Sequence, residues 1–208
     1  MRTNLFIDIL DSKQKEIFQL LDFTNENFYL AGGTALALQI GHRKSIDFDF
    51  FSNDKFNTEE LRIKIEEIFK GYRLVFSQIS PSTINMVVDG VKMSFFYYPY
   101  KPLYKLVETN RVNIADLMDI ACMKCSAITA RSVKKDYIDL FFLLKKFSLE
   151  EILSNCERKF PSLDRNVILK SLVYFGEIEE ENVVYMPNNG IDFSKIKKDL
   201  LNKVKAVF

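Results

Sequence analysis

The chain has 208 residues, of which 48% are hydrophobic and 19 are phenylalanines, so it can bury a sizeable core in one domain or in two small ones. Its 29 basic and 28 acidic residues give a net charge of +1, which excludes a global positive field that would attract nucleic acid to the whole surface. One histidine and three cysteines exclude a histidine-rich metal site and a disulfide framework, and we expect buried, reduced thiols.

The sequence contains no recognisable export or anchoring signal. No signal peptide is found, and no apolar run approaches twenty residues, which is about the length that a membrane-spanning helix needs. Lipidation motifs are also absent. We therefore expect a soluble cytoplasmic protein without a membrane partner.

The first hundred residues alternate predicted helices and strands. We expect an N-terminal helix over 5–22, with Asp11 or Ser12 as its candidate N-cap. A short apolar strand over 28–31 precedes a glycine turn and a helix that opens at Thr34. The further predicted elements are a strand over 46–51, a helix from Asn57 to about Lys70 that Gly71 ends, and strands near 72–79, 83–88 and 91–98, the last two joined by an Asp89-Gly90 turn. Together they predict a mixed sheet flanked by helices.

The turn after the first strand is a candidate phosphate-binding loop. Gly32 and Gly33 let the backbone approach an anion, and the free N–H groups at the start of the following helix favour negative charge. Thr34 and Ser45 offer hydroxyls to a phosphate oxygen or a metal-bound water. Arg43 either binds a phosphate with its guanidinium or lies in a solvated turn.

Asp47 and Asp49 are candidate metal ligands on the next predicted strand. Alternation places both carboxylates on one face, roughly 6.5 to 7 Å apart, while Ile46, Phe48 and Phe50 fill the other face. Two carboxylates this close raise each other's pKa unless a cation lies between them. Mg²⁺ takes one or two carboxylates together with substrate phosphates, and a pair of such ions suits phosphoryl displacement. A solvated sheet face is the alternative, and the glycine loop beside the strand favours the metal site.

The second half of the chain is predicted to be helical. Pro99 and Pro102 interrupt the α/β pattern, so we place the domain boundary within 99–113, with an α/β head at 1–112 and a helical subdomain at 113–208. The predicted helices are those over about 114–129, over the segment that follows Arg131, from Ser148 to Arg158, and near 163–175 and 193–206. The fold class is therefore α+β, with a helical C-terminal subdomain that completes a cleft.

A lysine interrupts the apolar stripe of the helix over 114–129. Leu117, Ala121, Lys124 and Ile128 recur at steps of three and four residues. The Lys124 ammonium therefore either snorkels outward to a surface acid or meets an anion, which would be a triphosphate or a carboxylate of the site, because an unpaired buried charge is costly. Asp136 and Asp139 share one side of the next helix.

Five motifs occur together over residues 28–145. They are Gly-Gly-Thr-x-Leu at 32–36, Gly-His-Arg-x-Ser at 41–45, Asp-Phe-Asp-Phe-Phe at 47–51, the lysine-bearing helix around Lys124, and Lys-Asp-x-x-Asp at 135–139. This set resembles the AbiEii/AbiGii toxin family of nucleotidyltransferases, within the polymerase-β-like superfamily. The resemblance implies a polymerase-β-like head and an active site that includes Lys124 and Asp136, and less securely Asp139, facing Asp47 and Asp49.

The resemblance also implies an activity and its partners. A nucleoside monophosphate would move from a nucleoside triphosphate to an acceptor hydroxyl with Mg²⁺ or Mn²⁺, releasing pyrophosphate. Gly32, Gly33, Thr34, Arg43, Ser45 and Lys124 would bind the nucleotide, while Asp47 and Asp49 would ligate the metal. The family implies a toxin of a toxin–antitoxin or phage-defence system, with tRNA as the acceptor and a cognate antitoxin as protein partner.

One position departs from the superfamily pattern. A third carboxylate is expected on a neighbouring strand, and Ser94 stands there instead. Asp136 or Asp139 could substitute as the general base. The alternatives are a transferase with a small-molecule or protein acceptor, and a catalytically lapsed nucleotide-binding module.

Overall fold

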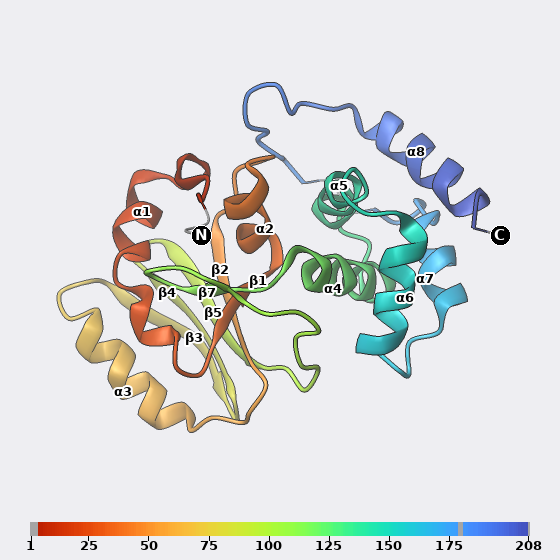
Figure 1. The fold of residues 1–208 in the computed structure, drawn as a ribbon. Coiled ribbons are helices and arrows are strands. Elements are labelled where there is room, and N and C mark those ends of the chain that lie inside the picture. The colour runs from red at the N-terminus through yellow and green to blue at the C-terminus, as the bar shows by residue number, and fades with distance from the viewer. Residues whose placement is uncertain (1–3, 179–180, 208) are drawn as a thin grey trace. The chain divides into compact units, whose positions relative to one another are not determined.

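The computed structural model describes residues 4–178 and 181–207, and the chain divides into two compact units. The first unit extends to Lys101 and includes Lys105–Ala115, while the second contains Pro102–Tyr104 and the chain from Asp116 onward. Most elements of both units are labelled in Figure 1. The two functional domains proposed from sequence, at 1–112 and 113–208, stay a prediction.

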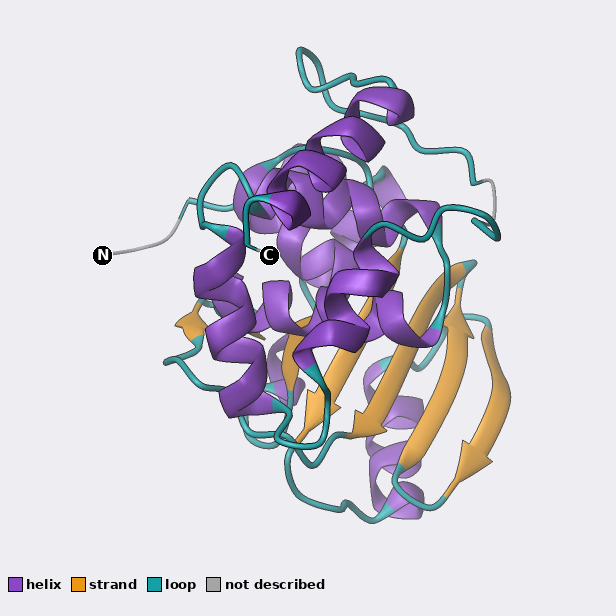
Figure 2. Cartoon of the chain, turned by 90° about the vertical axis from the view of Figure 1, so that its right-hand side faces the viewer, coloured by secondary structure: helices purple, strands orange, loops and turns teal. Residues whose placement is uncertain are grey.

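A mixed seven-stranded sheet is the centre of the first unit (Figure 2). In chain order the strands are β1 (Tyr29–Ala31), β2 (Asp47–Ser52), β3 (Leu74–Ser80), β4 (Thr83–Val88), β5 (Val91–Tyr97), β6 (Val107–Glu108) and β7 (Asn113–Ile114). Their spatial order is β3-β4-β5-β2-β1-β7-β6. β2 runs antiparallel to β1 and parallel to β5, so the strand with the two predicted metal ligands lies inside the sheet. The mixed sheet confirms the α+β prediction.

The two faces of this sheet differ in composition. Phe48, Phe50 and Phe95 are fully buried on one face, where Phe18 stacks on Phe48 with ring centroids 6.1 Å apart. Asp47 and Asp49 point to the opposite face, which we call the acid face. Strand alternation thus separates the aromatic core from the polar site.

The helices of the first unit are α1 (Ser12–Phe18), α2 (Gly32–Ile40) and α3 (Thr58–Ile68). The single N-terminal helix predicted over 5–22 is wrong, because 3-10 turns at Ile7–Ile9 and Leu21–Thr24 flank a shorter helix. Asp11 is the N-cap: its side chain accepts from the N–H of Gln14, and the Gln14 side chain accepts from the N–H of Asp11. This capping box starts a helix inside a segment whose apolar periodicity alone predicts one continuous helix.

The second unit contains the helices α4 (Leu117–Ala130), α5 (Lys134–Leu143), α6 (Leu149–Lys159), α7 (Arg165–Leu172) and α8 (Phe193–Lys205). Within it, α4 packs against α5, α6 and α7. The predicted start of α4 at Ile114 is wrong, since Ile114 pairs with Leu30 in the sheet and Asp116 caps α4 by accepting from the N–H of Met118 at 2.8 Å. Helical periodicity could not reveal a strand as short as β7.

The three cysteines are free and buried, as predicted. Cys122 lies on α4 and Cys156 on α6. A hydrogen bond with Cys156, together with burial, raises the pKa of the Cys122 thiol, so the thiolate that reacts with oxidants is disfavoured. Within the described residues, the helices are too short or too polar to traverse a bilayer.

A buried ion pair fixes residues 102–104 to the second unit. The Lys159 ammonium lies 2.7 Å from Oδ1 of Asp119, and both side chains are almost fully buried. The same carboxylate accepts hydrogen bonds from the backbone N–H of Leu103, at 2.9 and 3.0 Å to its two oxygens, and of Tyr104 at 3.0 Å. Asp119 therefore joins α4, α6 and a segment distant in sequence.

We expect Lys159→Met to destabilise the protein by about 3–5 kcal/mol, because it leaves the Asp119 carboxylate buried without its cation. Urea unfolding followed by circular dichroism would measure the change. Lys64→Met is the matched control, since Lys64 pairs with Glu26 at 3.6 Å on the surface, and it should move the midpoint little. Equal midpoints for the two variants would contradict the assigned role of Asp119 and Lys159.

Candidate functional site

The glycine turn between β1 and α2 lies directly against Asp49. Gly32 has a φ of +74°, and a Cβ atom at this position would lie 3.2 Å from Oδ2 of Asp49. A residue with a side chain is therefore disfavoured here both by backbone conformation and by contact. The loop predicted to bind phosphates and the strand predicted to bind metal thus meet at a defined pair of residues.

Two buried hydroxyls connect the start of α2 to the segment leading into β2. Thr34 Oγ1 lies 2.8 Å from Ser45 Oγ, and the Thr34 hydroxyl also donates to the carbonyl oxygen of Asp47. The Ser45 carbonyl accepts from Nε2 of Gln14 at 2.8 Å. These bonds hold the loop next to the strand, and direct contact of Thr34 or Ser45 with a phosphate stays a prediction.

Arg43 is buried beneath the glycine turn. A Cβ atom at Gly33 would collide with Nη2 of the Arg43 guanidinium, and Nη1 donates to the carbonyl of Lys44 at 2.9 Å. The alternative of a solvated turn is therefore wrong for Arg43, whereas Lys44 is exposed. A cationic group behind a loop of backbone N–H groups adds positive potential where an anion would bind.

Asp47 and Asp49 share the acid face as predicted, whereas Ile46 does not join the core. Ile46 precedes β2 and is 63% exposed, while Phe48 and Phe50 are fully buried. Oδ1 of Asp47 is buried and has no hydrogen-bond partner within the described part of the chain. A buried carboxylate oxygen without a partner is costly, and a bound cation would satisfy it.

The donor set at the acid face suits a hard divalent cation that completes its shell with other oxygens. Among the described residues there is no group of three or more His, Cys, Asp or Glu side chains able to hold a metal. Asp47 and Asp49 alone therefore fit Mg²⁺ or Mn²⁺, with substrate phosphates and water as the remaining ligands. They do not fit a closed zinc site.

Ser94 occupies the position beside Asp49 on the neighbouring strand. The parallel register of β2 and β5 pairs Asp49 with Ser94 and Asp47 with Lys92. A carboxylate at position 94 would complete a cluster of three acids with Asp47 and Asp49. The serine that departs from the superfamily pattern therefore lies directly beside the predicted metal ligands. Sequence reasoning missed Lys92 as a neighbour of Asp47, although the turn at Asp89-Gly90 and strand alternation place 92 and 94 on one face.

Lys124, Asp136 and Asp139 form an ion-pair cluster within the second unit. The Lys124 ammonium lies 2.7 Å from Oδ1 of Asp136 and 2.6 Å from Oδ2 of Asp139. Both aspartates are fully buried. The Lys124 ammonium therefore does not snorkel to a surface acid. It meets an anionic partner, as the other alternative predicts, and this partner is a pair of buried carboxylates.

Arg131 adds a second cation to this cluster. Its Nε lies 3.0 Å from Oδ2 of Asp136, and its side chain is 57% exposed while that of Lys124 is 7% exposed. Two cations and two carboxylates sum to zero formal charge, which lowers the cost of burying them. Arg131 is thus the cation that the cluster presents to solvent. That these residues face Asp47 and Asp49 across a cleft stays a prediction.

We expect Gly32→Ala to weaken Mn²⁺ binding on the order of 10-fold, because the methyl group would press on Oδ2 of Asp49. The positive φ should also cost about 1–2 kcal/mol of stability. Electron paramagnetic resonance titration of Mn²⁺, with a non-hydrolysable triphosphate present, would measure the binding.

Gly71→Ala is the control for this substitution. Gly71 has a φ of +95°, and nothing lies within 4 Å of a Cβ placed there. The Gly71→Ala variant should lose a similar amount of stability and keep the affinity of the natural protein for Mn²⁺. If both variants bind Mn²⁺ alike, the contact between Gly32 and Asp49 does not support a metal site.

Known proteins are similar to this chain in sequence or in fold. Residues 18–96 match the family model described as nucleotidyl transferase AbiEii toxin, type IV TA system. The uncharacterized protein aq_aa25 of Aquifex aeolicus (strain VF5) is 42% identical over 160 residues, covering 74% of this chain and 77% of the relative.

Two solved structures have a similar fold. A protein of H. pylori assigned as a nucleotidyltransferase has a TM-score of 0.57 at 16% identity, over 95% of this chain and 96% of its own. MenT4, a nucleotidyltransferase toxin from Mycobacterium tuberculosis H37Rv, has a TM-score of 0.56 at 11% identity, over 91% of this chain and 82% of its own. The chain is a nucleotidyltransferase and belongs to the AbiEii toxin family.

Proposed function

We propose that this nucleotidyltransferase transfers a nucleoside monophosphate from a nucleoside triphosphate to an acceptor hydroxyl, releases pyrophosphate, and depends on Mg²⁺ or Mn²⁺. One observation carries the proposal: Gly32 lies against Oδ2 of Asp49, next to an Asp47 whose buried Oδ1 has no described partner. A loop able to approach phosphates therefore lies next to two carboxylates, one of which has a buried oxygen that a cation would satisfy. That combination is what metal-dependent phosphoryl transfer needs.

The first unit would supply the binding of the triphosphate. Asp47 and Asp49 would hold the metal, and a bound metal would supply charge neutralisation at the phosphates. The backbone N–H groups at Gly32, Gly33 and Thr34 donate to phosphate oxygens at the start of α2. Arg43 supports them from below through its contact with Gly33.

The second unit would supply fixed charges. We propose that Lys124, Asp136 and Asp139 belong to the active site, as the family resemblance implies. The ion pairs of Lys124 support a positioning role, because its ammonium is held by two carboxylates and cannot swing freely toward a phosphate. In this arrangement Asp136 orients Lys124 and Arg131 together, and Asp139 is the remaining candidate for a base near an acceptor hydroxyl.

We propose tRNA as the acceptor and a toxin's role in the cell. The family description, a toxin of a type IV toxin–antitoxin system, supports both the role and a cognate antitoxin as partner. Basic residues of α8 support binding of a polyanion: Lys195, Lys197, Lys198, Lys203 and Lys205 all lie on this helix. Phosphate contacts of such lysines supply affinity without sequence preference. We expect the enzyme to act in the cytoplasm.

Ser94 favours a second candidate function, a lapsed module that binds nucleotides without transferring them. Ser94 pairs with Asp49 in the sheet where an acid is expected, and a serine hydroxyl is no base at neutral pH. A small-molecule or protein acceptor would preserve the chemistry and change only the second substrate. Supplying labelled triphosphate together with tRNA, antibiotic or protein pools separates these acceptors.

Asp49→Asn should lower nucleotidyl transfer by at least about 10²-fold, because it removes a charge next to the reacting phosphate while keeping the shape of the side chain. Transfer of label from α-³²P triphosphates to a tRNA pool would measure the rate. Asp54→Asn is the control, since Asp54 follows the same strand and is exposed. Undiminished labelling by the Asp49 variant would overturn the assignment.

Ser94→Ala should retain transfer, because a base elsewhere would take the proton from the acceptor. Isothermal titration calorimetry should also show triphosphate binding that weakens when Mg²⁺ is removed, since the two aspartates then repel the phosphates. Binding that ignores Mg²⁺, with no transfer by the natural protein, would instead establish the lapsed module.

A further inference from the structure

The acid face continues beyond the aspartates across three more strands. Strand register places Lys92 of β5 beside Asp47, Val87 of β4 beside Lys92, and Val75 of β3 beside Val87. These four residues form one row that runs straight across the sheet. Lys92 is exposed, Val87 is half-buried, and Val75 is 47% exposed at the sheet edge.

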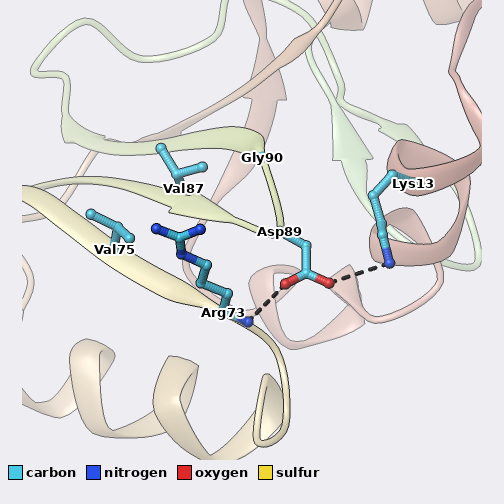
Figure 3. A pocket seen from close by; sticks show the side chains of 6 residues that line it. All are labelled: Lys13, Arg73, Val75, Val87, Asp89 and Gly90. Atoms are coloured by element: carbon cyan, nitrogen blue, oxygen red, sulfur yellow. Dashed lines mark hydrogen bonds and ion pairs between the residues drawn. The ribbon is translucent and has the colours of Figure 1, made fainter.

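The row ends at a pocket of about 550 Å³, a volume typical of sites for small organic ligands. The pocket is lined by Lys13, Arg73, Val75, Val87, Asp89 and Gly90 (Figure 3). In Figure 3 the Arg73 guanidinium lies beside Val75 and Val87, whereas the Lys13 ammonium lies on the other side of Asp89. The pocket thus combines an apolar wall with a cation.

Among the described residues, Asp89 is the one acid that lines this pocket, and it is already engaged in other interactions. Asp89 accepts from the backbone N–H of Arg73 at 2.7 Å and pairs with Lys13 at 3.2 Å. These two interactions lower the pKa of Asp89. Its negative charge is therefore matched locally, and the guanidinium of Arg73 dominates the end of the row.

The spacing of the cations suits a chain of phosphates. Three inter-strand steps of about 4.8 Å separate β2 from β3, so Arg73 lies about 14 Å or more from the strand of Asp47. Lys92 lies one step from Asp47 on the same line. A polynucleotide has a phosphate every few ångströms and apolar base faces between them, and two cations separated by two valines complement that repeat.

We propose that Lys92, Val87 and Val75 of this row, together with Arg73 at its end, form an acceptor track that binds the acceptor as a single-stranded polynucleotide. The strand's terminal hydroxyl lies at Asp47 and Asp49. Lys92 binds a phosphate near that end, Arg73 binds one a few nucleotides away, and a base contacts Val75 and Val87. The inference rests on the proposed function and adds the path that the acceptor strand takes across the sheet.

Fluorescence anisotropy of labelled single-stranded octamers, of RNA and of DNA, tests the track without any catalysis. Arg73→Gln and Lys92→Gln should each weaken binding and reduce the slope of log affinity against log salt by about 0.7, and the double variant by about 1.4. Arg62→Gln is the matched control, because Arg62 lies on α3, in ion pairs with Glu59 and Glu66. A double variant with the slope of the control, or no binding of either octamer by the natural protein, overturns the proposal.

Acceptor length gives a second test. Arg73→Gln should lower kcat/KM on the order of 10-fold for an octamer acceptor and leave a dinucleotide acceptor unaffected, because the shorter strand does not reach Arg73. Equal effects on both lengths would overturn the track. Asp49→Asn should abolish transfer to both acceptors while leaving octamer binding intact. If only the loss of transfer by Asp49→Asn is not observed, the proposed function is wrong. If only the expected effects of Arg73→Gln are not observed, the acceptor track is wrong.

Discussion

The parallel pairing of β2 with β5 is the constraint on which the candidate site depends. It places β2 inside the sheet, fixes Asp49 beside Ser94 and Asp47 beside Lys92, and leaves both carboxylates on the face opposite the phenylalanine core. A slip of one residue would bury the aspartates and expose Phe48 and Phe50. The burial of those two rings therefore holds the charged groups in place.

The local order of the first unit could be predicted from the sequence because its signals are local. Hydrophobic alternation marks the long strands, Asn57 caps α3 by accepting from Glu59 and Glu60, and Asp89-Gly90 forms the turn with both residues at positive φ. The prediction of one helix over 5–22 is wrong for a local reason as well. The Asp11 capping box starts a new helix, although the apolar periodicity continues through this position.

Pairings between distant segments could not be predicted. Nothing in Asn113–Ile114 marks a strand, because its place follows from pairing with β1. The Asp119–Lys159 pair likewise joins α4 and α6 through two residues that are 40 positions apart. The sequence marks Lys124 as a charge in an apolar stripe, but it does not determine which anion the ammonium meets. In the structure this anion is the pair Asp136 and Asp139, and Arg131 is the exposed cation of the same cluster.

The anchoring of residues 102–104 by Asp119 has a consequence for how the chain can be divided. The backbone passes between the two units at 101/102, 104/105 and 115/116, so no single peptide cleavage separates the units cleanly. A cut at 115/116 keeps the first unit whole but removes residues 102–104 from the second. Cutting after residue 112 would strip β7 from the sheet, and cutting before residue 102 would leave a strand-forming tail attached to the helices. The two units are thus interlaced along the chain, and a fragment that contains only one of them must either lose part of that unit or carry part of the other.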